Sequence, residues 1–540
     1  MKQAEVMRRL ILYSLLVSSA FAFQLPFKVP FFKSKTAIVS ESAQGTPRIA
    51  IIGAGAGGSS AAFWISKAKE RFGIHVEVDV YERAAYVGGR SITVYPYNDT
   101  SLSPVELGAS IFVDANKNLM RASREFNLSL SKFEDDDSDT GIWDGEHFVL
   151  IMNSGSYVKS WWSTIKVLWR YGYSSPSKTK ALVQNMINRF VGLYATESPR
   201  WDDLADLATK FDWMSMVNQS TAEYLESNGV SPRFSRELVE AATRVNYGQN
   251  IDEIHALEGA CSMAASGASG VSTGNYHIFE HFLEKSGAKV HLNTNVKEIK
   301  HKADSSLWTL HTDAGSDTYT GVIIAAPFHQ SGIKLPSDLS SLIPPQPYVH
   351  LHVTLLSTRN EHPNPEYFGL PANTIVPKTI LTTYEGARAG GLEPEFNSLT
   401  YHGLTRETTN STDDGVTTAR QPEWVVKIFS KERVSDEWLK TVFGHVGWVF
   451  RKEWDAYPKL PPTNEFPPVK LDQGLYYVNA FEPFISTMET ETISSRNVVD
   501  LLLHEEFGSG ICGSLLSGTN SSEERGTNAT PDDFVLGWDC

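Results

Sequence analysis

Cysteine is scarce in this chain, and long apolar runs are missing beyond its N-terminus. The 540 residues include only three cysteines, Cys261, Cys512 and Cys540, which excludes a disulfide-rich scaffold and offers no zinc-ligand spacing. Either Cys512 and Cys540 close the tail with a disulfide and leave Cys261 over, or they stay unpaired. No later stretch reaches the roughly 18 apolar residues of a membrane-spanning helix, and the C-terminus lacks the hydrophobic tail of a lipid-anchor signal.

Basic residues are outnumbered by acidic ones. There are 48 Lys and Arg against 63 Asp and Glu, a formal charge of -15. Such a surface repels phosphate backbones, so nucleic-acid binding is excluded, and no motif predicts a protein partner. The chain is also too long for one hydrophobic core, so more than one domain is expected.

The N-terminus has the pattern of a secretory signal. A basic leader precedes a short apolar run, Leu10–Ala20, and Ala20-Phe21-Ala22 fits an A-x-A cleavage site. An uncleaved anchor is the alternative. The signal predicts a lysosomal, vacuolar or extracellular destination. It makes glycosylation plausible at the N-x-[ST] sequons, which lie at Asn98, Asn127, Asn218, Asn410, Asn520 and Asn528.

A glycine-rich loop follows the first predicted strand. RIAIIGAGAGG places Gly53, Gly55 and Gly58 in a G-x-G-x-x-G pattern between a strand and a helix, which is typical of a loop that holds a pyrophosphate at a helix N-terminus. The next strand, HVEVDVYER, ends at Glu82, where a carboxylate can bind ribose hydroxyls. The unit is therefore predicted to bind a nucleotide.

The residues just downstream indicate which nucleotide. ERAAYVGGRS places Glu82-Arg83 shortly before a second glycine pair, which ends at Gly89 and is followed by Arg90. This second close backbone approach, with a cation beside it, suits an extended FAD and is not needed for NAD. The alternative is that Arg90 is a surface arginine after a turn, with no role in binding a cofactor.

The predicted architecture is α/β, with a Rossmann-like FAD-binding domain assembled from discontinuous segments and a mixed substrate-binding domain. The helical part is rich in tryptophan and could line an apolar tunnel, cover the core or lie against a membrane. The predicted parts are a signal peptide (1–22), a linker (23–45), the FAD-binding segments (46–145, 246–330 and 466–507), the helical aromatic region (146–245), the substrate domain (331–465) and a flexible tail (508–540).

ERAAYVGGRS and VELGASIFV together resemble the FAD-binding start of the amine-oxidase and phytoene-desaturase superfamily. GLYYVNAFEPFISTMET resembles its closing flavin motif. The resemblance implies that the stretch with Glu106, Gly108 and Ala109 runs beside the flavin and that the strand at Val296 meets the adenine. It also implies that Glu482 lies in a strand-to-helix turn, with the backbone amides near Thr487 and Met488 facing the pyrimidine end of the flavin.

Four further motifs resemble the prenylcysteine oxidase (prenylcysteine lyase) family within that superfamily: WRYGY (169–173), RVNYGQ (244–249), EWVVKIFS (423–430) and WDAYP (454–458). The resemblance implies an FAD-dependent thioether oxidase. It would cleave prenylcysteine with oxygen and water to a prenyl aldehyde, free cysteine and hydrogen peroxide, and so serve the breakdown of prenylated proteins.

The implied chemistry needs a group that assists the addition of water. Candidates are Tyr247, Tyr457 and Glu482, although both tyrosines could simply be packed side chains and Glu482 could orient the flavin loop. Arg244 could hold the substrate carboxylate or form an internal ion pair. Trp169, in the aromatic region, is a candidate contact of the prenyl chain.

The sequence departs from the family at three places: the insertion at 405–422, the tail after residue 507, and Pro483 and Phe484, which follow Glu482. These departures leave the substrate more open than the reaction. One alternative is another FAD oxidase, which acts on an amine or on a prenylated thioether metabolite. A second is a non-catalytic prenyl-binding carrier, but a carrier would not need the intact two-part glycine clamp. Peripheral membrane contact is a further expectation, because a prenyl chain is drawn from membranes.

Overall fold

The structure is a computed structural model that describes residues 45–132, 139–153, 165–265, 267–302, 305–405, 422–512 and 534–540. These residues belong to one compact unit, Thr46–Cys540, apart from Gly45. The predicted signal peptide, nearly all of the linker, most of the insertion at 405–422 and three sequons (Asn410, Asn520 and Asn528) lie outside the described residues.

The first sheet has six strands in the order β19-β20-β13-β1-β2-β9. All neighbours in it are parallel except β19 and β20. The strands are β1 (Arg48–Ile52), β2 (Glu77–Tyr81), β9 (Lys289–His291), β13 (Gly321–Ile324), β19 (Lys470–Asp472) and β20 (Leu475–Tyr477).

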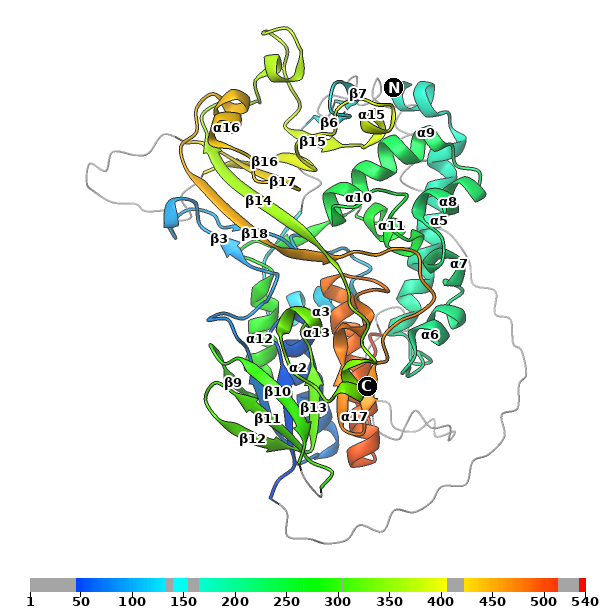
Figure 1. The fold of residues 1–540 in the computed structure, drawn as a ribbon, viewed down its shortest axis with the longest axis vertical. Helices are drawn as coiled ribbons and strands as arrows, with labels where there is room; N and C mark the ends of the chain where they lie inside the picture. Colours follow the sequence, from blue (N-terminus) through cyan, green and yellow to red (C-terminus); the bar gives the residue numbers. More distant parts are fainter. Residues whose placement is uncertain are drawn as a thin grey trace, which may run out of the picture. The chain divides into compact units, whose positions relative to one another are not determined.

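The helices that pack beside this sheet are α2 (Ala56–Phe72), α3 (Lys117–Glu125), α12 (Tyr276–Ser286) and α17 (Met488–Phe507). In Figure 1 the blue β1 and α2 lie beside the orange α17, although more than 400 residues separate them in the chain. The burial pattern explains this arrangement, because β1 is buried almost throughout and α17 is buried over most of its length. The predicted β-α-β unit and Rossmann-like fold are confirmed.

A second sheet has seven strands in the order β18-β14-β17-β16-β15-β6-β7. Its strands are antiparallel except for the pair β15 and β6. They are β6 (Thr140–Trp143), β7 (Phe148–Met152), β14 (Tyr348–Thr358), β15 (Thr379–Thr382), β16 (Ser398–Leu404), β17 (Trp424–Ser430) and β18 (Val449–Pro458). Since β6 belongs to this sheet, the first FAD-binding segment ends before residue 139, not at 145.

Helices dominate the region after β7, as the sequence predicts. They are α5 (Ser174–Phe190), η2 (Val191–Tyr194), α6 (Leu204–Lys210), α7 (Met214–Val217), α8 (Thr221–Ser227), α9 (Pro232–Phe234), η3 (Ser235–Val239), α10 (Glu240–Tyr247) and α11 (Ala256–Met263). α11 packs on α10, α8, α7 and α5, so this helical layer extends past the predicted boundary at 245.

The remaining elements are short or lie at the edges. The strands are β3 (Thr93–Val94), β4 (Val105–Glu106), β5 (Leu130–Lys132), β8 (Ser269–Val271), β10 (Val296–His301), β11 (Trp308–Thr312) and β12 (Ser316–Tyr319). The helical turns are η1 (Pro96–Asn98), α13 (Phe328–Ser331), α14 (Ser337–Ser340), η4 (Pro365–Phe368), α15 (Glu385–Arg388), α16 (Asp436–Phe443) and η5 (Val478–Phe481). After β20 the chain turns directly into η5.

The end of the chain is fastened to the core. Cys512 and Cys540 form a disulfide, and Cys261 is the free cysteine of the described residues. The Trp538 ring packs against Phe63 and Trp64 of α2, with centroid distances of 4.9 and 5.6 Å. The prediction of a flexible tail from 508 to 540 is therefore wrong for the last residues, 534–540, because their apolar side chains are buried against α2 and the disulfide holds them there.

Candidate functional site

The glycine-rich loop has backbone contacts that only glycine allows. Gly53 has a φ of 109°, and its amide donates to the Tyr81 carbonyl at 2.8 Å. A Cβ at Gly53 would overlap the Ala325 carbonyl oxygen, and a Cβ at Gly58 would overlap the carbonyl oxygen of Gly53. Strand and helix therefore approach as closely as the sequence pattern predicts.

The N-terminus of α2 is open to a ligand. Its N-cap is Gly55, and no side chain of the described residues caps it. A helix start of this kind presents backbone N–H groups and a positive dipole end to an anion. This is the geometry that a pyrophosphate requires.

The second glycine pair lies directly against the first loop. Gly55 and Gly88 form an isolated β-bridge, and the Gly88 amide donates to the Ala54 carbonyl at 2.9 Å. Gly89 has a φ of 61°, and a Cβ there would lie 3.3 Å from the Gly55 Cα. The two glycine turns thus form one continuous backbone surface, as expected for a clamp on an extended dinucleotide.

Glu82 stands beside this surface, but Arg83 turns away from it. One Glu82 carboxylate oxygen accepts the Ala54 amide at 2.9 Å, and the other accepts the Ala84 amide at 2.7 Å. These two bonds fix the carboxylate at the end of β2, where a ribose would lie. Arg83 donates instead to the Gln330 carbonyl at 3.2 Å.

Arg90 is bound to Glu482. The guanidinium forms an ion pair with one oxygen of the buried Glu482 carboxylate, the Tyr348 hydroxyl binds the other, and Arg90 also donates to the Ala456 carbonyl at 3.2 Å. Burial by itself lowers the pKa of Arg90, and the Glu482 charge more than offsets it, so the pKa is raised. Arg90 is thus a partly exposed ion-pair partner of a buried carboxylate and not a free surface arginine, and Glu482 anchors the flavin-motif turn.

The segment after β4 crosses the site under two side chains of the second sheet. Trp454 packs on Gly108, where a Cβ would lie 3.0 Å from its ring, and Ala109 has a φ of 49°. Lys427 Nζ donates to the Glu106 carbonyl and to Ser110 Oγ, each at 3.0 Å. These contacts fix the backbone that was predicted to run beside the flavin.

Lys427 and Glu106 have shifted pKa values. Burial lowers the pKa of Lys427 to about 8, against the opposing charge of Glu106. Burial raises the pKa of Glu106 to about 7, against the Asn275 amide bond and Lys427. The sequence analysis did not single out Lys427, although a lysine inside the apolar strand WVVKIFS was a visible signal.

The closing motif ends at the start of α17. Thr487 is the N-cap, and its hydroxyl accepts the Thr490 amide at 3.0 Å. Met488 is the first residue of this 20-residue helix, whose N-terminal dipole end stabilises nearby negative charge. Val296, expected near the adenine, is buried at the start of β10.

One buried acid at this site escaped the sequence analysis. A Cβ at Gly57, in the first turn of α2, would lie 3.0 Å from a Glu491 carboxyl oxygen, and the other oxygen has no hydrogen-bond partner among the described residues. Burial and the nearby Glu482 raise the pKa of Glu491 well above its ordinary value, against the charge of Arg90. A buried carboxyl with a raised pKa and an unused oxygen beside the dinucleotide loop suits a site built for a polar cofactor.

A mostly apolar cavity of about 130 Å³ lies at the start of α17. Its walls come from the segment after β4, from α5, from α10 and α11, and from the turn into α17. They include Phe112, Met186, Phe190, Tyr247, Cys261 and Met488. Phe112 and Met488, on its wall, belong to the two segments that the sequence predicts to flank the flavin.

The described aromatic residues of the 169–173 stretch do not line this cavity. Trp169 is 88% exposed and does not line the cavity, whereas Met186 and Phe190 of α5 do. The prediction that Trp169 contacts a buried prenyl chain is wrong for this cavity, because its side chain points to solvent. Trp161 and Trp162 lie outside the described residues.

Tyr247 is the predicted catalytic residue that reaches the cavity. Tyr457 packs on it at a centroid distance of 5.7 Å but does not line the cavity, and neither does Glu482. Tyr247 is hydrogen-bonded to the Glu258 carboxyl, which also accepts the Ser486 amide at 3.2 Å. Burial raises the pKa of Glu258 to about 7. Glu258 is a second functional candidate that the sequence analysis missed.

Arg244 is buried away from the cavity. It donates to Thr382 Oγ1 at 2.9 Å, Asn250 Oδ1 at 2.8 Å and Asn397 Oδ1 at 3.1 Å. No ion pair of Arg244 occurs among the described residues, and burial lowers its pKa. The internal ion-pair alternative is therefore not what the described part of the chain shows.

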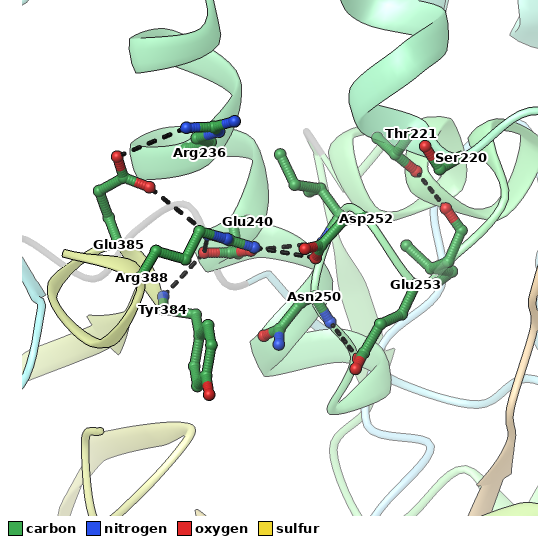
Figure 2. Close-up of polar contacts among 12 residues, drawn as sticks. Ser220, Thr221, Arg236, Glu240, Asn250, Asp252, Glu253, Tyr384, Glu385 and Arg388 are labelled. Atoms are coloured by element: carbon green, nitrogen blue, oxygen red, sulfur yellow. Dashed lines mark hydrogen bonds and ion pairs between the residues drawn. The ribbon is translucent and has the colours of Figure 1, made fainter. Parts of the chain in front are cut away.

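Glu240, on the same helix as Arg244, forms its ion pair with a different arginine. Arg388 binds both Glu240 oxygens, at 2.5 and 2.8 Å, and the Tyr384 amide donates to the same carboxylate at 2.7 Å (Figure 2). Arg388 also reaches Asp252 at 2.9 Å. This network ties α10 to α15 and leaves the Arg244 charge without a counter-ion of its own.

Comparison with known proteins shows which family the chain matches. A family model described as prenylcysteine lyase matches residues 156–510, more than half of the chain, and an NAD(P)-binding Rossmann-like domain model matches residues 51–126. The chain belongs to the prenylcysteine lyase family.

Two relatives match along almost their whole length. Farnesylcysteine lyase of Arabidopsis thaliana is 28% identical, with 91% of this chain and 94% of the relative covered. Human prenylcysteine oxidase 1 is 27% identical, with 85% of this chain and 90% of the relative covered.

Solved structures share the fold. A putrescine oxidase variant has a TM-score of 0.54 at 14% identity, covering 85% of this chain and 99% of that one. A fatty acid isomerase from P. acnes has a TM-score of 0.55 at 13% identity, with 85% and 99% covered. These likenesses concern the fold alone. No helix of the described residues has the length and apolar character needed to cross a membrane.

Proposed function

We propose that this protein is an FAD-dependent thioether oxidase that cleaves prenylcysteine. The observation that carries the proposal is that a chain of this family has both a complete two-part glycine clamp and an apolar cavity at the start of α17. Prenylcysteine, oxygen and water are converted to a prenyl aldehyde, free cysteine and hydrogen peroxide. In this balance the allylic carbon is oxidised, its bond to sulfur breaks, and oxygen is reduced.

The residues present fit FAD. Gly53, Gly55 and the Gly88–Gly89 turn would hold the pyrophosphate, and Glu82 the ribose. The start of α17 at Thr487 would meet the pyrimidine end. When bound, FAD supplies the two-electron acceptor.

The side chains of the cavity walls would position the substrate. Apolar side chains such as Phe112, Met186 and Phe190 would bury the prenyl chain and exclude bulk water from the reacting carbon. Tyr247 is the polar group on this wall that is backed by a buried acid. We infer that its hydroxyl orients the water that adds to the oxidised carbon, while Glu258 holds or accepts the proton.

The response of the bound flavin to farnesylcysteine distinguishes this proposal from an FAD oxidase that acts on another substrate. The purified protein would be mixed with farnesylcysteine without oxygen, and the visible band of oxidised flavin followed. Bleaching, with its recovery and peroxide release in air, supports thioether oxidation. A yellow protein that does not bleach would exclude prenylcysteine and favour an amine or another thioether. A colourless protein that cannot be reconstituted with FAD would favour the prenyl-binding carrier.

We further propose entry into the secretory pathway and glycosylation, on the strength of the N-terminal pattern. The three described sequons, Asn98, Asn127 and Asn218, all have exposed side chains, which supports modification there. A mass shift on treatment with a glycosidase that removes N-linked glycans, reduced by Asn→Gln changes at these three positions, tests the proposal.

Peripheral membrane contact is a separate proposal. It is supported by exposed aromatic residues, since Trp169 is 88% exposed and Tyr173 77% exposed, next to Lys166 and Arg170. Co-sedimentation with anionic vesicles that is lost in W169A/Y173A supports the contact, and binding unchanged in the variant excludes this surface.

A further inference from the structure

Two histidines and two acids face one another across the β14–β18 pair. In this antiparallel ladder His350 is opposite Asp455 and His352 is opposite Glu453. Residues two apart on a strand share a face, and opposite residues are neighbours, so the four side chains form a compact group on one face. Figure 1 shows the two strands running side by side.

The distances suit coordination. His350 Nδ1 lies 3.2 Å from an Asp455 oxygen, and His352 Nδ1 lies 3.7 Å from a Glu453 oxygen. Potential ligand atoms of His350, His352 and Glu453 all lie within 4.8 Å of one another. Tetrahedral zinc, with bonds of about 2.0–2.2 Å to nitrogen and oxygen, requires ligand atoms only slightly closer than this. Exposed side chains reach that spacing by small rotamer changes.

The two carboxylates of the group form no ion pairs outside it among the described residues. Among the ion pairs and hydrogen bonds of the described residues, Glu453 and Asp455 have only these imidazoles as partners. Neither carboxylate is paired with a lysine or arginine there. Two carboxylates and two imidazoles offer a divalent cation a neutralising, nitrogen-containing ligand set.

The other histidine–acid pairs of the described residues differ. His301 with Asp472 and His277 with Glu280 each bring together one imidazole and one carboxylate. The β14–β18 group is the one in the described part of the chain where three ligand-bearing residues converge. Its solvent exposure also provides an entry path for an ion.

We propose that His350, His352, Glu453 and Asp455 form a zinc-binding site on the outer face of the β14–β18 pair. β18 is the edge strand of its sheet, and Trp454 and Tyr457 on its opposite face pack with the core that includes Leu351 and Val353. A bound ion would hold this edge strand to β14 and so steady the strand that places Trp454 on Gly108.

Zinc titration tests the site, independently of the proposed oxidase function. Chelator-treated full-length protein, followed by calorimetry, is expected to bind one zinc ion per chain. H350Q/H352Q should abolish this binding, and E453Q should weaken it at least tenfold. H301Q, which removes an isolated histidine–acid pair, serves as the matched control and should bind like the wild type.

Two results would overturn the proposal. One is a wild-type protein that takes up no zinc, and the other is stoichiometric binding that H350Q/H352Q leaves unchanged. His350 and Glu453 are exposed and His352 is partly buried, and glutamine keeps a polar side chain of similar size, so circular dichroism in the presence of chelator should be the same for all variants. The zinc-dependent rise in melting temperature should occur in the wild type and in H301Q but not in H350Q/H352Q.

Discussion

At the scale of single residues, the site depends on glycines that lack a Cβ and on a buried acid whose pKa is raised. Gly53 and Gly58 leave no room for a Cβ, and Glu258 is an acid kept from water between Tyr247 and Ser486. The sequence pattern identified the glycines, since their spacing is itself the signal. It did not identify Glu258, whose importance arises from its burial.

Gly58→Ala is expected to remove the cofactor. The new methyl group would overlap the Gly53 carbonyl oxygen, which forces β1 and α2 apart and displaces the amides at the helix start. The flavin-to-protein absorbance ratio after purification measures the effect. Gly45→Ala, where nothing lies within 4 Å of the added Cβ, should keep the full ratio. Equal flavin content in both variants would contradict the role given to this loop.

Glu258→Gln should change how stability depends on pH. Burial raises the pKa of Glu258 from 4.5 to about 7, so between these values the folded state holds a proton that the unfolded state has lost. Stability of the wild type relative to the variant therefore falls as pH rises through this window, by up to about 3 kcal/mol.

Chemical denaturation below and above that window measures the change. Exposed Glu226→Gln is the matched control and should follow the wild-type profile. Parallel wild-type and Glu258→Gln profiles would show that the carboxyl ionises freely. If Glu258 also serves catalysis through Tyr247, the pH dependence of kcat should shift in Glu258→Gln and be partly restored in Glu258→Asp.

At the scale of elements, one buried carboxylate joins the helical layer to the second sheet. Glu240 of α10 is bound by Arg388 of α15 and by the Tyr384 amide, which fixes the segment after β15 (Figure 2). Long helices and buried strands were predictable from apolar periodicity. The pairing of β6 with β15 was not, because no local pattern shows which strands meet across more than 200 residues.

Arg388→Met should destabilise the protein by about 3–5 kcal/mol, because it leaves the Glu240 charge buried without its partner. The double variant E240Q/R388M should recover much of this loss, since the charge left without its partner, Asp252, is exposed to solvent and no buried charge remains unpaired. Urea denaturation of the single and double variants measures both. A loss in the double variant as large as in Arg388→Met would contradict the electrostatic explanation.

At the scale of the whole molecule, segments from the two ends of the described chain pack against each other. α17, near the C-terminus, packs on α2, and the Cys512–Cys540 disulfide holds Trp538 on the same helix. The dinucleotide fold is thus completed by residues from both ends of the described chain. This explains why the FAD-binding segments are discontinuous in sequence.

C512S/C540S should lower the free energy of unfolding by about 3.6 kcal/mol, the loop-closure value for cysteines separated by 28 positions in the sequence. Because Trp538 packs on α2, flavin release should begin at a lower urea concentration than in the wild type. C261S, which removes the free cysteine, is the control and should not shift flavin release. Unchanged release in C512S/C540S would show that the tail contributes nothing to the dinucleotide fold.

The sequence by itself determined the dinucleotide loop, the second glycine pair, the family and the long helices, because these depend on residues close together in the chain. Only the tertiary structure decided that Arg90 pairs with Glu482, that Tyr247 rather than Trp169 faces the cavity, and that Glu258, Lys427 and the β14–β18 histidine group have their particular surroundings. Those properties depend on burial and on partners far away in the sequence, and burial is a property of the folded chain alone.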